Sequence, residues 1–352
     1  MNAIIRSMRP EQWLKNGFVL APIVFAARIS DPGAWVRILL ALAAFCAASS
    51  ATYLVNDILD READRLHPSK RKRPIAAGEL SVGLALAVSA ALVIFAVAVA
   101  VALGGWFPAV LITYVVLVVI YSAVLKRAVF LDVLVVAAGF VLRVVGGAVA
   151  IDVPVSRWIL LVAYLLALYL ALGKRRTELV VLGTEAGNHR VVLGHYTLPM
   201  VDSAISVVLG ATVLAYALYT VAPDTVAKVG SEGLMATVPI VLYGLFRYLY
   251  LLHRHELGGS PTRALLTDRP LLICVVVWMV VAAVVINYAP CSNSQFSVLN
   301  SEFPPILPVS GEGGWELRIE NSKLRIQPRS RSAIFAAAAR ACLIQSLTLT
   351  PR

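Results

Sequence analysis

The sequence contains few charged residues and few cysteines, and each scarcity excludes a class of protein. Charged residues make up 14% of the 352 residues, whereas 59% are apolar and the mean hydropathy is +0.81. Soluble domains contain about 25% charged residues, and a soluble fold could not hide so much apolar surface. Disordered chains are also excluded, because they are charged and poor in aliphatic residues. The composition therefore indicates an integral membrane protein.

The four cysteines and five histidines form no disulfide framework or metal-binding pattern. No two cysteines have the CxxC spacing, and Cys46 and Cys274 lie in apolar runs, where a thiol behaves as a small hydrophobe. The net charge of +11 does not indicate a nucleic-acid partner, because the basic residues are confined to short segments between apolar runs. We therefore expect neither a cysteine metal site nor nucleic-acid binding.

Nine apolar stretches have lengths near the roughly 20 residues that a helix needs to cross a bilayer. They cover residues 13–28, 36–57, 82–104, 106–125, 130–150, 157–173, 201–222, 234–252 and 270–288. The first is the weakest, because it is short and contains Pro22. The pattern predicts an all-α integral membrane protein with about nine transmembrane helices.

Lysine and arginine fall mainly on one side of these stretches. The N-terminal segment and the loops at 58–80, 126–129, 173–200 and 253–270 hold 18 of them, and the opposite loops hold four. Basic loops mark the cytoplasmic side of a membrane protein. We therefore expect a cytoplasmic N-terminus and, with an odd number of spans, a C-terminus outside.

The character of the sequence changes near residue 290. Residues 290–352 are polar, with prolines at 304–305 and a glycine-rich stretch at 311–314, and they contain no spanning pattern. We predict a transmembrane catalytic domain over 1–289 and a disordered or non-native tail over 290–352, which carries no chemistry.

A polar stripe follows the second apolar stretch. Tyr53, Asn56, Asp57, Asp60 and Asp64 have the spacing i, i+3, i+4, i+7, i+11, which places them on one face of a helix. Three carboxylates within about 12 Å of helix length repel one another unless a cation lies among them, and oxygen ligands suit Mg²⁺. Since Mg²⁺ is often shared with substrate phosphates, the stripe predicts a substrate that carries diphosphate. The alternative is an ordinary solvated helix end.

A basic segment follows the acidic stripe at once. Lys70, Arg71, Lys72 and Arg73 lie between two prolines. Carboxylates that hold a metal and cations that bind phosphates are the combination that phosphoryl substrates require. A cluster that only fixes the membrane orientation is the alternative, although it does not explain why the cations adjoin the acidic stripe.

The motif Asn56-Asp57-x-x-Asp60-x-x-x-Asp64, the run RPIAAG at 73–78 and about nine spans resemble the UbiA superfamily of intramembrane prenyltransferases. The resemblance covers about residues 1–289. It implies a helical bundle around a cavity open to lipid, with the aspartate motif at the cytoplasmic mouth of that cavity.

Typical members have a second aspartate-rich motif after the sixth span, but here residues 173–178 read GKRRTE. Four further stretches are RPEQWLKN at 9–16, YSAVLK at 121–126 with Asp132, GSPT at 259–262 and TDRPL at 267–271. Together with the basic replacement, they resemble the subfamily of decaprenyl-phosphate phosphoribosyltransferases. That resemblance implies transfer of 5-phosphoribose from phosphoribosyl pyrophosphate (PRPP) to a polyprenyl phosphate in a bacterial plasma membrane. The product would feed arabinan synthesis for the cell wall.

On this hypothesis Asp57, Asp60 and Asp64 bind Mg²⁺, and further residues bind the two anionic substrates. The predicted substrate-binding residues are Lys15, Asn16, Asn56, Lys70, Arg71, Arg73, Tyr121, Lys126, Asp132, Arg143, Lys174, Arg175 and Glu178. The expected partners are PRPP, the polyprenyl phosphate and the lipid bilayer, and the sequence is compatible with a homo-oligomer.

Asp132 and Arg143 are ionisable residues in the fifth span, 11 residues apart and therefore on nearly the same helix face. Ionisable groups at membrane depth are by default functional and face a cavity. A buried Arg–Asp or Arg–carbonyl pair that only holds helices together is the alternative.

Two other functions are compatible with the sequence. A prenyltransferase that uses a prenyl diphosphate and an aromatic or haem acceptor is disfavoured by the missing second aspartate motif. A transporter of a phosphorylated lipid or anion predicts inverted repeats, and the two halves of the sequence do not visibly repeat.

Overall fold

The computed structural model describes residues 3–26, 28–66, 70–183, 191–254, 267–288, 317–320 and 323–326. The chain divides into two compact units, Met1–Ser294 and Gln295–Arg352. In the described part of the first unit, the regular elements are all helices. The motif at 259–262 lies outside the described residues.

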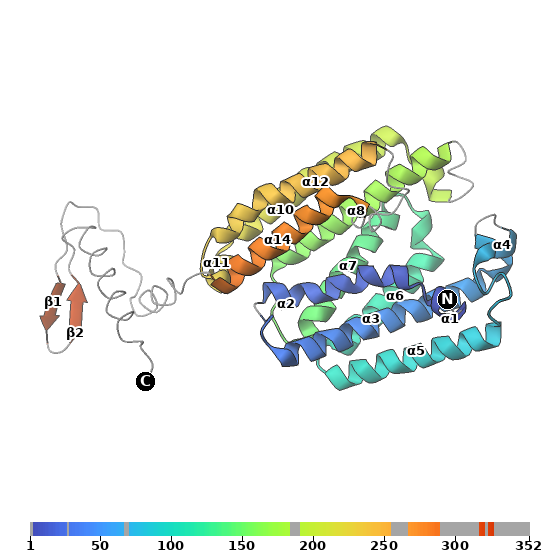
Figure 1. The fold of residues 1–352 in the computed structure, drawn as a ribbon, viewed down its shortest axis with the longest axis horizontal. Coiled ribbons are helices and arrows are strands. Elements are labelled where there is room, and N and C mark those ends of the chain that lie inside the picture. The colour runs from blue at the N-terminus through green and yellow to red at the C-terminus, as the bar shows by residue number, and fades with distance from the viewer. Residues whose placement is uncertain are drawn as a thin grey trace. The chain divides into compact units, whose positions relative to one another are not determined.

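The first unit is a bundle of long helices joined by short connections (Figure 1). Its first half contains α1 (Ala3–Met8), η1 (Pro10–Leu20), α2 (Ala21–Phe25), α3 (Pro32–Leu59), α4 (Arg61–Leu66), η2 (Lys70–Lys72), α5 (Val82–Leu103), α6 (Phe107–Ala123), η3 (Leu125–Arg127) and α7 (Leu131–Ala150). Its second half contains α8 (Arg157–Leu182), η5 (Val191–His195), α10 (Leu198–Val221), α11 (Pro223–Val229), η6 (Gly233–Thr237), α12 (Val238–His253) and α14 (Arg269–Tyr288).

The predicted all-α membrane architecture is confirmed, but the count of nine spanning helices is not. Seven described helices are long and apolar enough to cross a membrane, and α6 is a shorter apolar helix. The segment predicted as the first span, 13–28, is instead the 3₁₀-helix η1 followed by the short helix α2. Pro22 stands at the first turn of α2, and it removes a backbone donor that a continuous helix over 13–28 would use.

The N-terminal segment packs so tightly on α7 that only glycine fits between them. A Cβ atom at Gly147 would lie 1.9 Å from the carbonyl oxygen of Val19, and one at Gly146 would lie 2.5 Å from the Phe45 ring. This close approach holds η1 against the helix that carries Asp132 and Arg143. The position of η1 therefore depends on the missing side chain of Gly147, whereas Gly146 gives room to the Phe45 ring of α3.

Helix α3 begins with a side chain that satisfies its terminal backbone groups. Asp31 accepts hydrogen bonds from the N–H groups of Gly33 and Ala34, and these bonds, with that from Arg28, hold the pKa of Asp31 below its ordinary value. At the other end the helix stops at Leu59, and Asp60 is the capping residue. The acidic stripe is therefore divided between α3 and α4, whereas the sequence predicts one continuous helix.

The second unit contains one described element pair. Strands β1 (Leu317–Glu320) and β2 (Lys323–Ile326) pair antiparallel, with Leu317 opposite Ile326. The sequence pattern predicts no regular structure in this segment. Alternating apolar and charged residues in both strands explain the difference, because this period places the apolar side chains on one face.

Candidate active site

The acidic motif lies at the end of α3 and in α4, where its carboxylates are paired with arginines. Asp57 and Asp64 are buried, with 3% and 2% of their surface exposed. One guanidinium nitrogen of Arg73 lies 3.0 Å from an Asp57 oxygen and 2.7 Å from an Asp64 oxygen. Arg9 also forms an ion pair with Asp57. The break between α3 and α4 therefore does not separate the two carboxylates.

The position of Arg73 tests whether these residues fit a metal ion. The guanidinium nitrogen holds two carboxylate oxygens at most about 5.7 Å apart, and oxygens on opposite sides of Mg²⁺ are about 4.2 Å apart. A cation already lies between the two carboxylates, and the donors are oxygens of the type that Mg²⁺ prefers. The residues therefore fit a divalent ion if Arg73 withdraws. Among the described residues, no group of three potential ligands is assembled in the present arrangement.

Asn56 and Asp60 form the remaining part of the motif. The Asn56 amide donates a hydrogen bond of 2.9 Å to an Asp60 carboxylate oxygen. Both side chains are partly exposed, whereas Asp57 and Asp64 are buried. The hydrogen bond from the neutral amide orients Asp60 without neutralising its charge.

Arg9 is a site residue that the sequence prediction omits. Its backbone is left-handed, with φ of 54°, and its guanidinium lies 4.9 Å from the centre of the Tyr53 ring. The following Pro10 disfavours the right-handed helical conformation at Arg9, which explains the break between α1 and η1. Left-handed conformations of non-glycine residues concentrate at functional sites. The Arg-Pro dipeptide beside an apolar stretch was the available signal.

Lys15 is a cation of η1 that lies near cations of other segments. It is half-buried, and the charges of Arg9, Arg143 and Lys174 all act on it. Within the part of the chain that the structure describes, Lys15 forms no ion pair or hydrogen bond, and the charges that act on it are all positive. A half-buried cation surrounded by other cations favours an anionic ligand.

Arg143 is buried and bonded to neutral groups. Its guanidinium donates to the Asn16 side-chain oxygen at 2.7 Å, to the Gly139 carbonyl at 2.8 Å and to the Tyr114 hydroxyl at 2.8 Å. Among the described residues it has no carboxylate partner. Of the two structural alternatives, an Arg–Asp pair with Asp132 is absent from the described contacts, and an Arg–carbonyl contact is present. That Arg143 and Asn16 contact substrate stays a prediction.

Asp132 pairs instead with the basic segment of α8. Both groups are buried, and Arg175 donates through Nε to Asp132 at 2.8 Å. Arg175 also forms an ion pair with Glu178, which lies 3.7 Å from the Lys174 ammonium. The Tyr196 hydroxyl donates to the other Asp132 oxygen at 2.7 Å. Sequence reasoning missed Tyr196, because no pattern links the end of η5 to α7.

Two tyrosines connect the acidic and basic parts of the site. Tyr53 lies near enough to Arg9, Arg143 and Tyr121 for electrostatic interaction, and Tyr121 lies near enough to Arg175. The structure therefore brings the ends of α3, α6 and α8 and the segment η1 to one region. The aspartate motif, Lys15 and the basic segment of α8 all belong to it.

Other predicted residues are not joined to this region by described contacts. Arg71 is exposed on η2, and Lys126 is half-buried on η3. Neither forms an ion pair or hydrogen bond within the part of the chain that the structure describes. Their binding roles, and that of Lys70, stay predictions.

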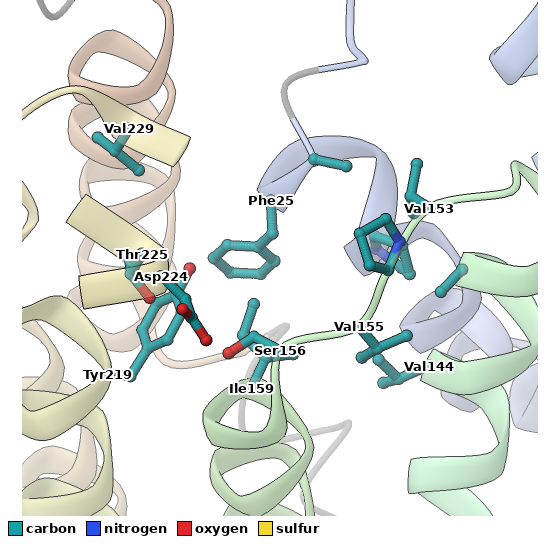
Figure 2. Close-up of a pocket in the computed structure, with 14 residues that line it drawn as sticks. Phe25, Val144, Val153, Val155, Ser156, Ile159, Tyr219, Asp224, Thr225 and Val229 are labelled. Atoms are coloured by element: carbon teal, nitrogen blue, oxygen red, sulfur yellow. The ribbon is translucent and has the colours of Figure 1, made fainter. Parts of the chain in front are cut away.

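A separate pocket lies between the start of α8, the later part of α7, the end of α10 and the short helices α2 and α11 (Figure 2). The cavity has a volume of about 30 Å³ and is lined mainly by apolar residues of α2, α7, α8, α10 and α11 and of the connection before α8. Figure 2 shows the Phe25 ring among the lining residues, between Asp224 on the left and Val155 on the right. None of the predicted site residues lines this pocket, so it is distinct from the candidate active site.

Residues 18–267 match the model of the UbiA prenyltransferase family. Decaprenyl-phosphate phosphoribosyltransferase of Corynebacterium glutamicum is 34% identical over 283 residues, which cover 79% of this chain and 85% of that protein. The protein of the same name from Mycobacterium tuberculosis is 32% identical over 280 residues, which cover 78% of this chain and 91% of that protein.

The fold is similar to a UbiA homolog from Archaeoglobus fulgidus, solved bound to DMAPP and Mg²⁺. The TM-score is 0.61 at 18% identity, and the match covers 80% of this chain and 98% of that one. At this identity the similarity concerns the fold alone. It confirms the predicted family architecture of a multi-pass helical membrane protein.

Proposed function

The chain belongs to the UbiA prenyltransferase family, and we propose that it transfers 5-phosphoribose from PRPP to decaprenyl phosphate or another polyprenyl phosphate, with release of diphosphate. The relatives from Corynebacterium glutamicum and Mycobacterium tuberculosis, both named for decaprenyl-phosphate phosphoribosyl transfer, support this choice. The product would serve as a precursor of cell-wall arabinan.

The observation that carries the proposal is the excess of unpaired positive charge beside the acidic motif. Lys15 and Arg143 have no carboxylate partner among the described residues, and both lie in the region where the helix ends meet. Cations held away from water are costly unless anions compensate them. Two substrates that each carry phosphate supply such anions.

The acidic motif fits a divalent metal, and we assign Mg²⁺ to it. Asp57, Asp60 and Asp64 would hold the ion, which when bound would neutralise charge on the departing diphosphate. Arg73 and Arg9 pair with these carboxylates in the arrangement described. Once displaced, the two arginines are available as donors to the phosphate oxygens of PRPP.

The remaining cations position the two anionic substrates against each other. The attacking group is an oxygen of the lipid phosphate, which is already anionic, so the bond to C1 of the ribose forms without a strong general base. The bond from C1 to the diphosphate breaks, and the diphosphate takes the electron pair. The site must hold both anions in line despite their repulsion, and we assign Lys15, Lys174 and Arg175 to that task.

We place the site at the cytoplasmic face of a bacterial plasma membrane, with the N-terminus on the same side. The basic loops support this orientation, and PRPP is water-soluble whereas the acceptor is a lipid. A site at the ends of spanning helices meets both substrates. A homo-oligomer is compatible with this placement.

The experiment that tests the proposal supplies purified protein in detergent with Mg²⁺, decaprenyl phosphate and PRPP labelled in the ribose. We expect label in the organic phase, and its loss when EDTA is added. A parallel reaction replaces both substrates with a prenyl diphosphate and an aromatic acid. Condensation in that reaction, without transfer of ribose, would overturn the substrate assignment.

A further inference from the structure

We infer that Tyr196 is a positioning residue for Arg175, acting through the Asp132 carboxylate. The inference rests on the proposed function, because it assigns Arg175 to an anionic group of PRPP. It concerns a residue in the short segment between η5 and α10, which the sequence patterns do not connect to the site.

The three side chains form one buried chain of hydrogen bonds. Tyr196 donates to one oxygen of Asp132 at 2.7 Å, and Arg175 donates through Nε to the other oxygen at 2.8 Å. All three residues are at least 95% buried. Each oxygen of the carboxylate is therefore held by a donor, and the two donors together fix the plane of the group.

The direction of the tyrosine hydrogen bond is set by a second contact. The backbone N–H of Phe130 donates to the Tyr196 hydroxyl oxygen at 2.7 Å. The hydroxyl hydrogen must then point to Asp132. Burial and the bond to Asp132 raise the pKa of Tyr196, so the group keeps this hydrogen throughout the neutral range.

The backbone at Phe130 shows that this contact is built into the start of α7. Phe130 has a φ of 62°, a left-handed conformation that side chains rarely adopt. Its ring lies against that of Tyr196 in an edge-on contact, with 5.5 Å between the ring centres. Phe130, which lies two positions before Asp132, thus directs its backbone N–H to the Tyr196 hydroxyl.

These hydrogen bonds determine the orientation of the Arg175 guanidinium. Its Nε is bonded to Asp132 and its Nη1 to Glu178, and no described residue accepts a hydrogen bond from its Nη2. Two of the three nitrogens are held by carboxylates, so the third has a fixed direction. If Tyr196 released Asp132, the carboxylate could rotate and the guanidinium would lose that direction.

The test compares Tyr196→Phe with the matched variant Tyr169→Phe. Tyr169 is also buried, and its hydroxyl donates to the Leu245 carbonyl at 2.9 Å, away from the charged residues of the site. For Tyr196→Phe we expect the KM for PRPP to rise about tenfold, the worth of one hydrogen bond to a charged group, with kcat changed less than about twofold. For Tyr169→Phe we expect both constants to stay near the wild-type values.

A double variant separates positioning from a general structural effect. If Tyr196 acts through Asp132, adding Tyr196→Phe to Asp132→Asn should raise the KM no further than Asp132→Asn alone. A further tenfold rise in the double variant would overturn the inference. A lowered kcat and lowered thermal stability in Tyr196→Phe with an unchanged KM would also overturn it, because the role would then be structural.

An assay of the wild-type protein separates a failure of this inference from a failure of the proposed function. If the wild type transfers no phosphoribose, the proposed function fails and the inference fails with it. If the wild type is active and Tyr196→Phe behaves as Tyr169→Phe does, the inference alone is overturned.

Discussion

Replacing Arg73 with glutamine removes the cation that lies between two buried carboxylates. Asp57 and Asp64 would then face each other with oxygens at most about 5.7 Å apart. Loss of one partner from a buried ion pair costs about 3–5 kcal/mol. The lower value applies here, because Arg9 still pairs with Asp57 and the Arg73 side chain is 27% exposed.

About 3 kcal/mol corresponds to a decrease of about 6 °C in the thermal midpoint of a chain of this size. We expect that decrease for Arg73→Gln in detergent without added metal. Millimolar Mg²⁺ should restore most of it, since the ion can then bind the carboxylates without displacing an arginine. For the wild type, the thermal midpoint should rise less and only at a higher Mg²⁺ concentration, because the ion must displace Arg73.

The control is Lys72→Gln, which removes a cation from the same turn that pairs with neither carboxylate. Its midpoint should match that of the wild type with and without Mg²⁺. An unchanged midpoint in Arg73→Gln, or equal Mg²⁺ shifts in Arg73→Gln and the wild type, would refute the idea that the arginine and the metal compete for the carboxylates.

Three further predictions follow from single contacts. Lys15→Met should not lower the thermal midpoint, because Lys15 lies among other cations. It should raise the KM for PRPP or for the lipid phosphate about tenfold or more, because a charge-assisted hydrogen bond to an anion contributes about 1.5–3 kcal/mol. Unchanged steady-state constants would remove Lys15 from the site. Gly147→Ala should lower the thermal midpoint by several °C, since the added Cβ would lie 1.9 Å from the backbone of η1. Gly210→Ala should leave the midpoint unchanged, because no atom lies within 4 Å of the added Cβ. Equal midpoints for the two variants would contradict the packing. Hydrogen bonds from Arg247 lower the pKa of Asp268 from its ordinary value of 3.8. The stability that the ionised Asp268 contributes is therefore complete above about pH 4 and is lost as the pH falls through the lowered pKa. Thermal melts across this range should show a smaller loss of stability in acid for Asp268→Asn than for the wild type, and identical acid profiles would exclude this contribution.

Much of the fold follows from the length of the apolar stretches. Eight of the nine predicted stretches correspond to described helices, because lipid requires every backbone group to be bonded within the segment. The first stretch fails for a local reason. Pro22 interrupts the hydrogen bonding of a continuous helix, and the close contact at Gly147 holds η1 against α7; only the second of these depends on tertiary packing.

The acidic motif shows what spacing can and cannot predict. The spacing places Asp57 and Asp64 near each other, and the structure agrees, but the helix breaks at Asp60 and an arginine from a later loop bridges them. Similarly, Asp132 and Arg143 share a helix, yet Asp132 pairs with Arg175 from α8. Partners far apart in the sequence are chosen by packing, which periodicity within one helix does not encode.

The central claim is that phosphoribose, and not phosphate or a prenyl group, moves to the lipid. The most direct measurement uses PRPP with one label in the ribose and a different label in the diphosphate, with decaprenyl phosphate and Mg²⁺. We predict that the ribose label enters the organic phase while the diphosphate label stays in water, and that Asp60→Asn inserts into membranes normally but transfers neither. Diphosphate label in the lipid, or full activity in Asp60→Asn, would contradict the account.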